Sequence, residues 1–522
     1  MPLARVIATS AAVAATRSRT AKVAALAETL RAAAADPRPP EGPRQVEVVT
    51  DYLAGVLPQR RIGVSWRGLQ SLPAPAAGQT LSVLEVDEAL GSIAGIGGSG
   101  SAPLRRAAVG ELLGRATADE QVWLRALITG EVRQGAGDGI VQLAVAEAAQ
   151  VPLEAVRRAV MLAGRAGPVA RAALGPDAEA ALAAIGLEVG RPLRPMLAAS
   201  APTVSEAVGS LGQVALETKL DGIRLQAHVW GQAGDRQVRL FTRTLEDVTD
   251  RMPEVVEALA GLPVEVAVFD GEVIALRDDG RPQPFQVTGA RTASTADPHR
   301  LRAEVPLTTV LFDLLHRDGL DLIDLPGFRR WQALVETAPD LVVPRLETAD
   351  AAEAEAWFAD LVAAGHEGVV VKSLDTPYAA GRRGAGWVKV KPRHTFDLVV
   401  VAVEWGSGRR RGKLSNIHLA ARDEQTGDLV MLGKTFKGMT DEMLDWQTER
   451  FLALQTRQEG HVVHVRPEQV VEIAIDGVQR SRRYPGGIAL RFARVLRYRD
   501  DKPAAEIDTV QTVSRVAGAA LE

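Results

Sequence analysis

The sequence of 522 residues contains no cysteine. Structural disulfides are therefore excluded, and so is any zinc site built on thiolates. The absence also fits a reducing compartment, so we expect a cytoplasmic protein. Whatever chemistry the chain performs must use other side chains.

Long apolar runs are absent as well. No stretch of about 18 apolar residues occurs, so we expect no membrane-spanning helix and no membrane partner. The first residues, MPLARVIATSAAVAATRSR, imitate a targeting signal, but Thr9 and Ser10 interrupt their short apolar part. The pattern continues as TAKVAALAETLRAAAAD, which is typical of amphipathic helices inside a domain.

The formal net charge is only −4, so the whole chain is not a polycation. Basic residues are nevertheless clustered in PQRR, RRRGK and RSRRYPGGIALRFARVLRYRDDK. Local patches matter more to a polyanion than the global sum does. These clusters are therefore compatible with a nucleic-acid partner.

The length of the chain exceeds what one hydrophobic core supports, and the patterns predict three domains. Residues 1–188 are rich in Ala and Leu at helical spacing and predict an all-α domain. Residues 189–393 begin with a Pro-bearing linker and then alternate as strands with helical interludes, which predicts an α+β domain. Residues 394–522 predict a small β-barrel with one helix.

The stretch ETKLDGIRLQ places Lys219 at the end of a β-like run, directly before Leu-Asp-Gly. Asp-Gly is a common turn signal, so Lys219 could be an ordinary solvated charge. It could instead be a nucleophile, which would need neighbours that remove its proton. The stretch alone leaves both interpretations open.

An ordered series of further motifs follows Lys219. The series consists of Arg224 in the same stretch, Arg243 in TRTLEDVT, Asp270 and Glu272 in FDGEV, Phe312 and Asp313 in LFDLLHRDG, Glu367 and Lys372 in EGVVVK, and Lys389 and Lys391 in GWVKVK.

This series resembles the signature of covalent nucleotidyltransferases, the superfamily of polynucleotide ligases and mRNA capping enzymes. The terminal LRFARVLRYRDDK is similar to the last basic motif of ATP-dependent DNA ligases, and LITGEVRQGAGDGIVQLAVAEA resembles their DNA-binding domain. The resemblance covers essentially the whole chain. It implies an all-α DNA-binding domain, an α+β nucleotidyltransferase (adenylation) domain and a C-terminal OB-fold barrel, in the order of the multidomain ATP-dependent DNA ligase of some bacteria.

The resemblance implies ATP as the nucleotide and nicked duplex DNA as the substrate, with Lys219 carrying AMP. It further implies a divalent cation, Mg²⁺ or Mn²⁺, at Glu272 and Glu367. We also expect a monomer associated with the nucleoid. The implied nucleotide-binding residues are Glu217 at the adenine amino group, Phe312 on the base, Glu272 at the ribose, Arg224, Arg243 and Arg383 at the nucleotide or a substrate phosphate, Lys389 at phosphate, and Arg497 and Lys502 at the leaving pyrophosphate. Lys391 lies two residues after Lys389 on the same strand face, so both could point into one pocket.

The physical chemistry of the residues agrees with that activity. Only an unprotonated amine is a nucleophile, and nearby cations lower the pKa of a lysine. Attack on an anionic phosphorus depends on positioning and charge neutralisation, which accounts for the many Arg and Lys residues. Carboxylates suit a hard cation that prefers oxygen ligands.

Each assignment has a simpler alternative. Phe312 stands among apolar residues and could belong to a core, and Glu367 could be a solvated residue at the start of a strand. Arg383 could be an ordinary surface residue, since Arg382 is its neighbour. Asp270 and Asp313 could brace strand ends.

Basic residues beyond the motif series suggest contacts with DNA. Arg105, Arg106 and Arg133 stand beside Gly-rich loops, where helix starts would suit duplex phosphates. The run Arg409–Lys413 is either a solvated loop or a phosphate contact.

Four other activities compete with an ATP-dependent DNA ligase. An NAD-dependent ligase would carry a zinc-binding cysteine cluster, which the sequence lacks. A GTP-using capping enzyme fits poorly with the long helical leader and the ending RYRDDK. An RNA ligase would fit the core motifs, but the first domain points to duplex DNA. A non-catalytic DNA-binding scaffold would not need every charged position filled.

Overall fold

The computed structural model describes residues 1–35, 41–60, 62–98, 100–232, 234–379 and 386–516. Its first region is helical. The helices are α1 (Leu3–Ala15), α2 (Arg19–Ala34), α3 (Glu41–Leu53), η1 (Trp66–Leu69), α4 (Val83–Gly95), α5 (Ser101–Gly114), α6 (Ala118–Ile128), α7 (Asp138–Ala149), α8 (Leu153–Ala163), α9 (Ala166–Ala173) and α10 (Ala178–Ala183). They share one apolar core.

Local sequence signals explain where two of these helices begin. At the start of α4 the Ser82 hydroxyl accepts from the N–H of Glu85, and the Glu85 carboxylate accepts from the N–H of Ser82. Thr117 and Glu120 form the same reciprocal pair at the start of α6. Such capping boxes satisfy N–H groups that have no partner within the helix.

The middle region contains two sheets. The first has the strand order β1-β10-β9-β2-β8, and β2 is buried along its whole length. Helices α11 and α16 contribute to the apolar core beside this sheet. Its elements are β1 (Ala199–Ser200), α11 (Val204–Leu211), β2 (Val214–Thr218), β8 (Arg345–Thr348), α16 (Ala351–Ala363), β9 (Val369–Ser373) and β10 (Trp387–Val390).

The second sheet has the strand order β4-β3-β5-β6-β7, and a separate apolar core lies against it. Its elements are β3 (Ile223–Trp230), β4 (Gln237–Thr242), η2 (Thr249–Arg251), α12 (Pro253–Ala260), β5 (Val266–Ala275), α13 (Phe285–Ala293), α14 (Pro298–Glu304), β6 (Leu307–Arg317), β7 (Leu320–Asp321), α15 (Gly327–Thr337) and η3 (Pro339–Leu341).

The last region is a β-barrel built on the long strand β11, which pairs with β12, β15 and β16. Its elements are β11 (His394–Trp405), η4 (Gly408–Arg410), β12 (Leu414–Arg422), β13 (Leu429–Thr435), α17 (Asp441–Ala453), β14 (Gln455–Glu459), β15 (Val462–Val465), β16 (Val470–Ile475), β17 (Gly477–Arg480), β18 (Ile488–Arg491), β19 (Arg494–Arg499), η5 (Ala504–Glu506) and α18 (Val510–Arg515). The predicted barrel helix corresponds to α17. The short helix α18, which Thr509 caps, was not predicted.

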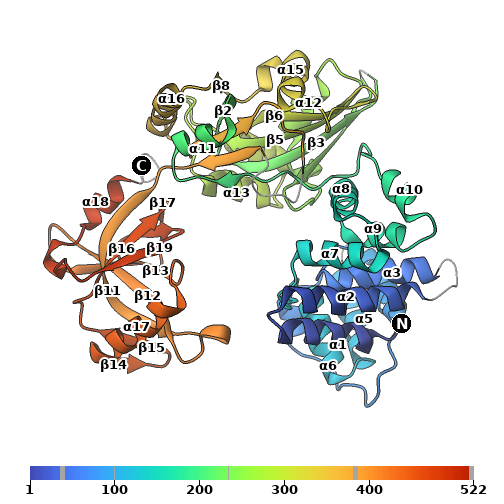
Figure 1. Ribbon diagram of the computed structural model, residues 1–522, viewed down its shortest axis with the longest axis horizontal. Helices are drawn as coiled ribbons and strands as arrows, with labels where there is room; N and C mark the ends of the chain where they lie inside the picture. The colour runs from blue at the N-terminus through green and yellow to red at the C-terminus, as the bar shows by residue number, and fades with distance from the viewer. Residues whose placement is uncertain (36–40, 61, 99, 233, 380–385, 517–522) are drawn as a thin grey trace.

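The predicted fold class is confirmed: helical, mixed α/β and β-rich regions follow one another along the chain. Figure 1 shows the middle region at the top, with the helical region below it on one side and the barrel below it on the other. Helix α8 lies next to the middle region, and its Met161 and Leu162 share an apolar cluster with Met196, Tyr378 and Trp387. In the described part of the chain, no helix is long and apolar enough to cross a membrane.

Candidate active site

A cavity of about 1270 Å³ lies between the two sheets of the middle region. Its walls come from the end of β2, from β5, β6, β9 and β10, and from α13. Arg491 and Phe492 of the barrel also line it. Ligand pockets commonly measure roughly 300–1,000 Å³, so the cavity has room for a nucleotide.

Lys219 is the first residue after β2, and backbone hydrogen bonds fix it to the loop before β9. Its N–H donates to the carbonyl of Gly368 (2.8 Å), and its carbonyl accepts from the N–H of Glu367 (3.2 Å). At Gly222 the chain passes so close to β5 that a Cβ atom would lie 2.3 Å from the carbonyl oxygen of Val273. The tight turn from β2 to β3 therefore needs glycine, and it leaves Lys219 in the cavity wall.

The Lys219 ammonium donates to Glu367, and the same carboxylate accepts from Lys391. Burial alone would raise the pKa of Glu367, but Lys219 and Lys391 outweigh burial and hold that pKa below its ordinary value. Lys391 also lies 3.6 Å from the carboxylate of Asp476 in the barrel. Three predicted residues, Lys219, Glu367 and Lys391, thus meet in one cluster.

Glu272 projects from β5 into the same cavity, where it accepts from the N–H of Gly222 (2.9 Å). Burial raises the pKa of Glu272 to about 7, although Lys219 opposes this effect. Within the described residues, no three His, Asp or Glu side chains gather to hold a metal by themselves. Mg²⁺ usually takes one or two carboxylates together with substrate phosphates, so Glu272 and Glu367 fit such an ion.

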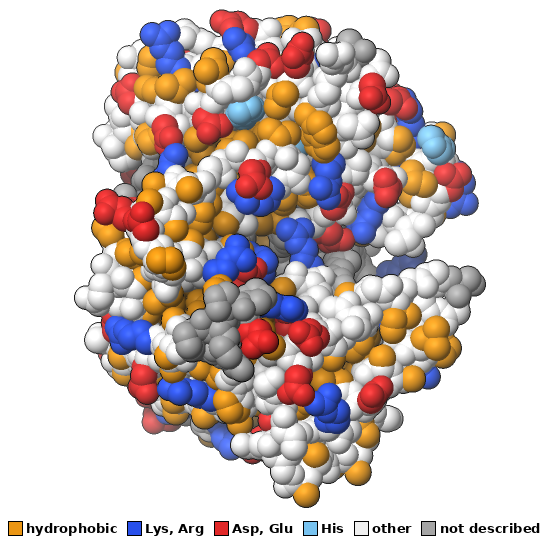
Figure 2. Space-filling model, turned by 90° about the vertical axis from the view of Figure 1, so that its right-hand side faces the viewer, with side chains coloured by type: hydrophobic (Ala, Val, Ile, Leu, Met, Phe, Trp, Pro, Cys, Tyr) orange, Lys and Arg blue, Asp and Glu red, His pale blue; other side chains and the backbone are white. Residues whose placement is uncertain are grey.

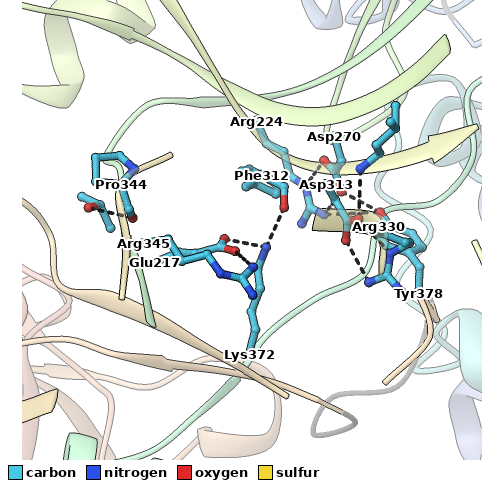
Figure 3. Close-up of polar contacts among 12 residues, drawn as sticks. Glu217, Arg224, Asp270, Phe312, Asp313, Arg330, Pro344, Arg345, Lys372 and Tyr378 are labelled. Atoms are coloured by element: carbon cyan, nitrogen blue, oxygen red, sulfur yellow. Dashed lines mark hydrogen bonds and ion pairs between the residues drawn. The ribbon is translucent and has the colours of Figure 1, made fainter. Parts of the chain in front are cut away.

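The other end of the cavity is aromatic and holds a buried carboxylate (Figure 3). Glu217 on β2 is 2 % exposed and lies between Lys372 (2.5 Å) and Arg345 (3.3 Å). The Phe312 ring also lines this end, and Trp387 contacts it edge to face at a centroid distance of 6.0 Å. Phe312 is half-buried: it packs against the apolar cluster that contains Trp387, and it also lines the cavity.

Arg224 lines the cavity, but its guanidinium is held by Asp270 on β5 at 2.5 and 3.0 Å (Figure 3). The Tyr378 hydroxyl donates to Asp270 (2.7 Å), and the carbonyl of Met196 accepts from Arg224 (2.6 Å). Asp270 is thus the charge partner of Arg224. Asp313 likewise forms a buried pair with Arg330 (2.8 Å), so both aspartates brace the site.

Cations line the cavity around the Lys219 cluster. Lys389 follows from β10, two residues before Lys391. Burial lowers the pKa of Lys389, and the positive charges of Lys391, Lys219 and Arg243 lower it further. The exposed Arg243 also lines this cavity. One end of the cavity thus holds aromatic rings beside the Glu217–Lys372 ion pair, and the other end holds the lysines around Glu367.

The structure places the remaining predicted residues elsewhere. Arg497 on β19 pairs with Glu472 (2.6 Å), and Lys502 pairs with Asp397 (2.8 Å); neither lines the cavity in this arrangement. Arg383 lies outside the described residues. The barrel instead contacts the site through Arg491, 3.2 Å from Asp221 of the Lys219 turn.

Family models match most of the chain in three consecutive segments. Residues 69–146 match the DNA ligase N terminus, residues 195–391 match the ATP dependent DNA ligase domain, and residues 410–502 match the ATP dependent DNA ligase C terminal region. The chain belongs to the ATP-dependent DNA ligase family. The predicted activity is therefore confirmed, and the capping enzyme, the RNA ligase and the non-catalytic scaffold are set aside.

Several relatives resemble the ligase along its whole length. A "Probable DNA ligase" of Nocardioides sp. is 61% identical over 519 residues, 99% of either chain. One of Beutenbergia cavernae is 59% identical and covers 99% of this chain and 100% of its own. The solved structure "Pmar-Lig_PreS3" shares the fold, with a TM-score of 0.60, 18% identity, and coverage of 95% of this chain and 99% of that one.

Some of the basic residues that were predicted to contact DNA form hydrogen bonds or ion pairs within the protein. Arg105 donates to the carbonyl of Gly63 (2.9 Å), and Arg133 lies 2.5 Å from Glu131. In the run Arg409–Lys413, Arg410 donates to the carbonyl of Phe436 (2.7 Å). Figure 2 shows the middle region above the helical region, with Lys and Arg side chains along the recess between them.

No role in the site was predicted for Lys372, Arg345, Tyr378 or Trp387. Lys372 and Trp387 belong to quoted motifs, so their neighbours could have suggested them. Arg345 stands outside every motif. It reaches the site because β8 pairs with β2 in a register that sets Arg345 opposite Glu217.

Proposed function

We propose that this ligase forms a covalent lysyl-AMP intermediate on Lys219. The Lys219 nitrogen attacks the α-phosphorus of ATP, the N–P bond forms, and the bond to pyrophosphate breaks. The ammonium must first lose its proton, and Glu367 is the carboxylate that it contacts. The single observation that carries this proposal is that Lys219 lines one cavity together with the aromatic residues Phe312 and Trp387 and the cations Lys389 and Lys391.

The polarity of the cavity supports the expected placement of ATP. The base would stack on Phe312 with its amino group toward Glu217, and Glu272 would face the ribose. Lys389, Lys391 and Arg243 would neutralise the phosphates, where preorganised charge is most effective. Arg224 would also contact phosphate, with its guanidinium held in place by Asp270.

Glu272 and Glu367 would hold one Mg²⁺ or Mn²⁺ ion. The ion supplies charge neutralisation at the phosphates when it is bound. Both carboxylates line the cavity, and a positive charge beside the half-buried Glu272 favours its ionised form. The chain's own lysines supply the remaining positive charge around Lys219.

The adenylated enzyme then acts on nicked duplex DNA. AMP moves to the 5′-phosphate at the nick, and the 3′-hydroxyl displaces AMP to close the strand. Arg105, Arg106 and Arg133 of the helical domain, together with the loop Arg409–Lys413 of the barrel, would bind backbone phosphates without reading sequence. One chain carries all these parts, which supports action as a monomer.

The proposed domains are 1–188 for DNA binding, 189–393 for adenylation and 394–522 for the OB-fold barrel. The element order supports these bounds, because α10 ends at Ala183 and β11 begins at His394. Arg497 and Lys502 would reach the leaving pyrophosphate only after the barrel moves, and Arg383 would contact phosphate. Because its substrate would be chromosomal DNA, we propose that the enzyme acts at the nucleoid, in the cytoplasm.

A sealing assay with variants of Lys219 tests the proposal. The wild type should join a nicked duplex with ATP, whereas Lys219→Ala and the charge-preserving Lys219→Arg should lose all sealing and all labelling by α-labelled ATP. Lys437→Ala, which changes an exposed barrel lysine, should behave as the wild type. Labelling of Lys219→Ala at the wild-type level would overturn the assignment.

A further inference from the structure

The carboxylate of Glu217 is fixed at both oxygens. Lys372 Nζ lies 2.5 Å from Oε2, and an Arg345 guanidinium nitrogen lies 3.3 Å from Oε1 (Figure 3). All three side chains are at least nine-tenths buried. The carboxylate therefore has neither a solvent shell nor freedom to turn.

Lys372 is also part of the surface against which a base would lie. Its Nζ donates to the carbonyl of Phe312 (2.9 Å) and lies over the rings of Trp387 (4.3 Å) and Phe312 (4.8 Å). The same ammonium thus holds Glu217 and is framed by the aromatic pair. A change at Lys372 acts directly on the aromatic end of the cavity.

The charge of Glu217 depends on its two cationic partners. Burial raises the pKa of Glu217, and Lys372 and Arg345 oppose that rise. Without them a buried carboxyl group takes up a proton, because an unpaired charge is costly in a low dielectric. An ionised carboxylate only accepts hydrogen bonds, whereas a protonated one can also donate.

This difference decides which purine fits. Adenine presents an amino donor at position 6, and hypoxanthine or guanine presents an oxygen acceptor there. An immobile acceptor binds the amino group and repels the oxygen. A ligand that leaves buried polar groups of the site without a hydrogen-bond partner binds much more weakly than one that pairs them.

We propose that Lys372 and Arg345 are positioning residues for nucleotide choice: they hold Glu217 as a fixed acceptor and so restrict the cavity to purines with a 6-amino group. This inference rests on the proposed placement of the base at Phe312. Lys372 carries more of the effect because it is closer to Glu217. Arg345 also binds Glu347 (2.6 Å) and lies over Trp331 (4.3 Å).

The test measures adenylation of Lys219 with ATP and with inosine 5′-triphosphate, whose purine carries oxygen at position 6 and no 2-amino group. In Lys372→Met, kcat/KM for ATP should fall, and the preference for ATP over inosine triphosphate should fall by at least about tenfold. Arg345→Met should reduce the preference less. Glu217→Gln, whose amide both donates and accepts, should also lose it.

A matched control is Lys434→Met, since Lys434 pairs with Glu404 in the barrel. Lys434→Met should keep the wild-type rate of adenylation by ATP and the wild-type preference for ATP over inosine triphosphate. If Lys372→Met folds poorly, the double variant Glu217→Gln/Lys372→Met removes the charges of Glu217 and Lys372 together and must also lose the preference. An unchanged preference in these variants overturns the inference while Lys219 adenylation by ATP stands; no adduct in the wild type would instead refute the proposed function.

Discussion

Individual charged side chains in the ligase site are held by partners that come from distant parts of the chain. The partly exposed Arg224 is held by the buried Asp270, and Arg330 and Asp313 form a pair that is almost wholly buried. Removing one member of such a pair leaves the other charge unpaired in a low dielectric, which is more costly than losing the attraction. Substitutions at these positions should therefore affect stability as well as activity.

His228 on β3 provides a test of burial at the residue scale. Its Nδ1 accepts from the N–H of Gly190 (3.0 Å), so Nδ1 carries no proton and the imidazole is neutral. Burial lowers the pKa of His228 to about 3. The unfolded chain then binds more protons between about pH 3 and 6.5, so stability falls as the pH falls through that window.

The wild type should therefore lose up to about 2 kcal/mol through His228 between about pH 6.5 and pH 5. His228→Gln should be less stable at pH 7.5 but should lose less on acidification, as measured by thermal melting. His299→Gln, at an exposed histidine, should follow the wild-type curve. Parallel curves for wild type and His228→Gln would contradict this account.

At the scale of elements, α8 joins the helical region to the adenylation domain. The N–H of Arg194 donates to the carbonyl of Met161 (2.9 Å), and Arg158 binds Asp324 through two contacts of 2.6 and 2.7 Å. The linker continues to Met196, whose N–H donates to the Tyr378 hydroxyl (3.0 Å). Docking of α8 therefore supports the wall of the cavity that contains Lys219.

Leu162→Ala tests this support. Leu162 is 2 % exposed in the cluster with Tyr378 and Trp387, so its truncation should cost about 2–5 kcal/mol and weaken ATP binding. Leu452→Ala, at a residue 42 % exposed on α17, should change neither quantity. Unaltered melting and ATP affinity in Leu162→Ala would mean that the two domains are energetically separate.

The site residues that could be predicted from the sequence are those that lie within short motifs. Lys219, Glu272 and Lys389 lie within motifs, so their presence could be inferred from a few neighbouring residues. Arg345 could not, because only the antiparallel register of β2 and β8 brings it to Glu217. Tyr378 could not either, since its hydroxyl meets Asp270 across 108 residues of chain.

At the scale of the whole molecule, the barrel contacts the adenylation domain by a few polar pairs. Gln286 donates to Gln479 (3.0 Å), and Arg491 binds Asp221. This arrangement holds Arg497 outside the cavity. If Arg497 and Lys502 act on pyrophosphate, the barrel must turn before adenylation.

The absence of cysteine makes that movement testable. Gln286→Cys/Gln479→Cys, joined by a short cleavable bis-maleimide, should lose adenylation by ATP and regain it when the linker is cut. Each single variant, treated in the same way, should adenylate normally. Full adenylation of the joined protein would show that the barrel need not move for this step.

The most direct test of the account is to locate the adenylate. The wild-type enzyme is mixed with ATP and magnesium, and the adduct is mapped by peptide mass spectrometry. We predict one AMP on the peptide that contains Lys219. AMP on another residue, or no adduct at all, would contradict the mechanism.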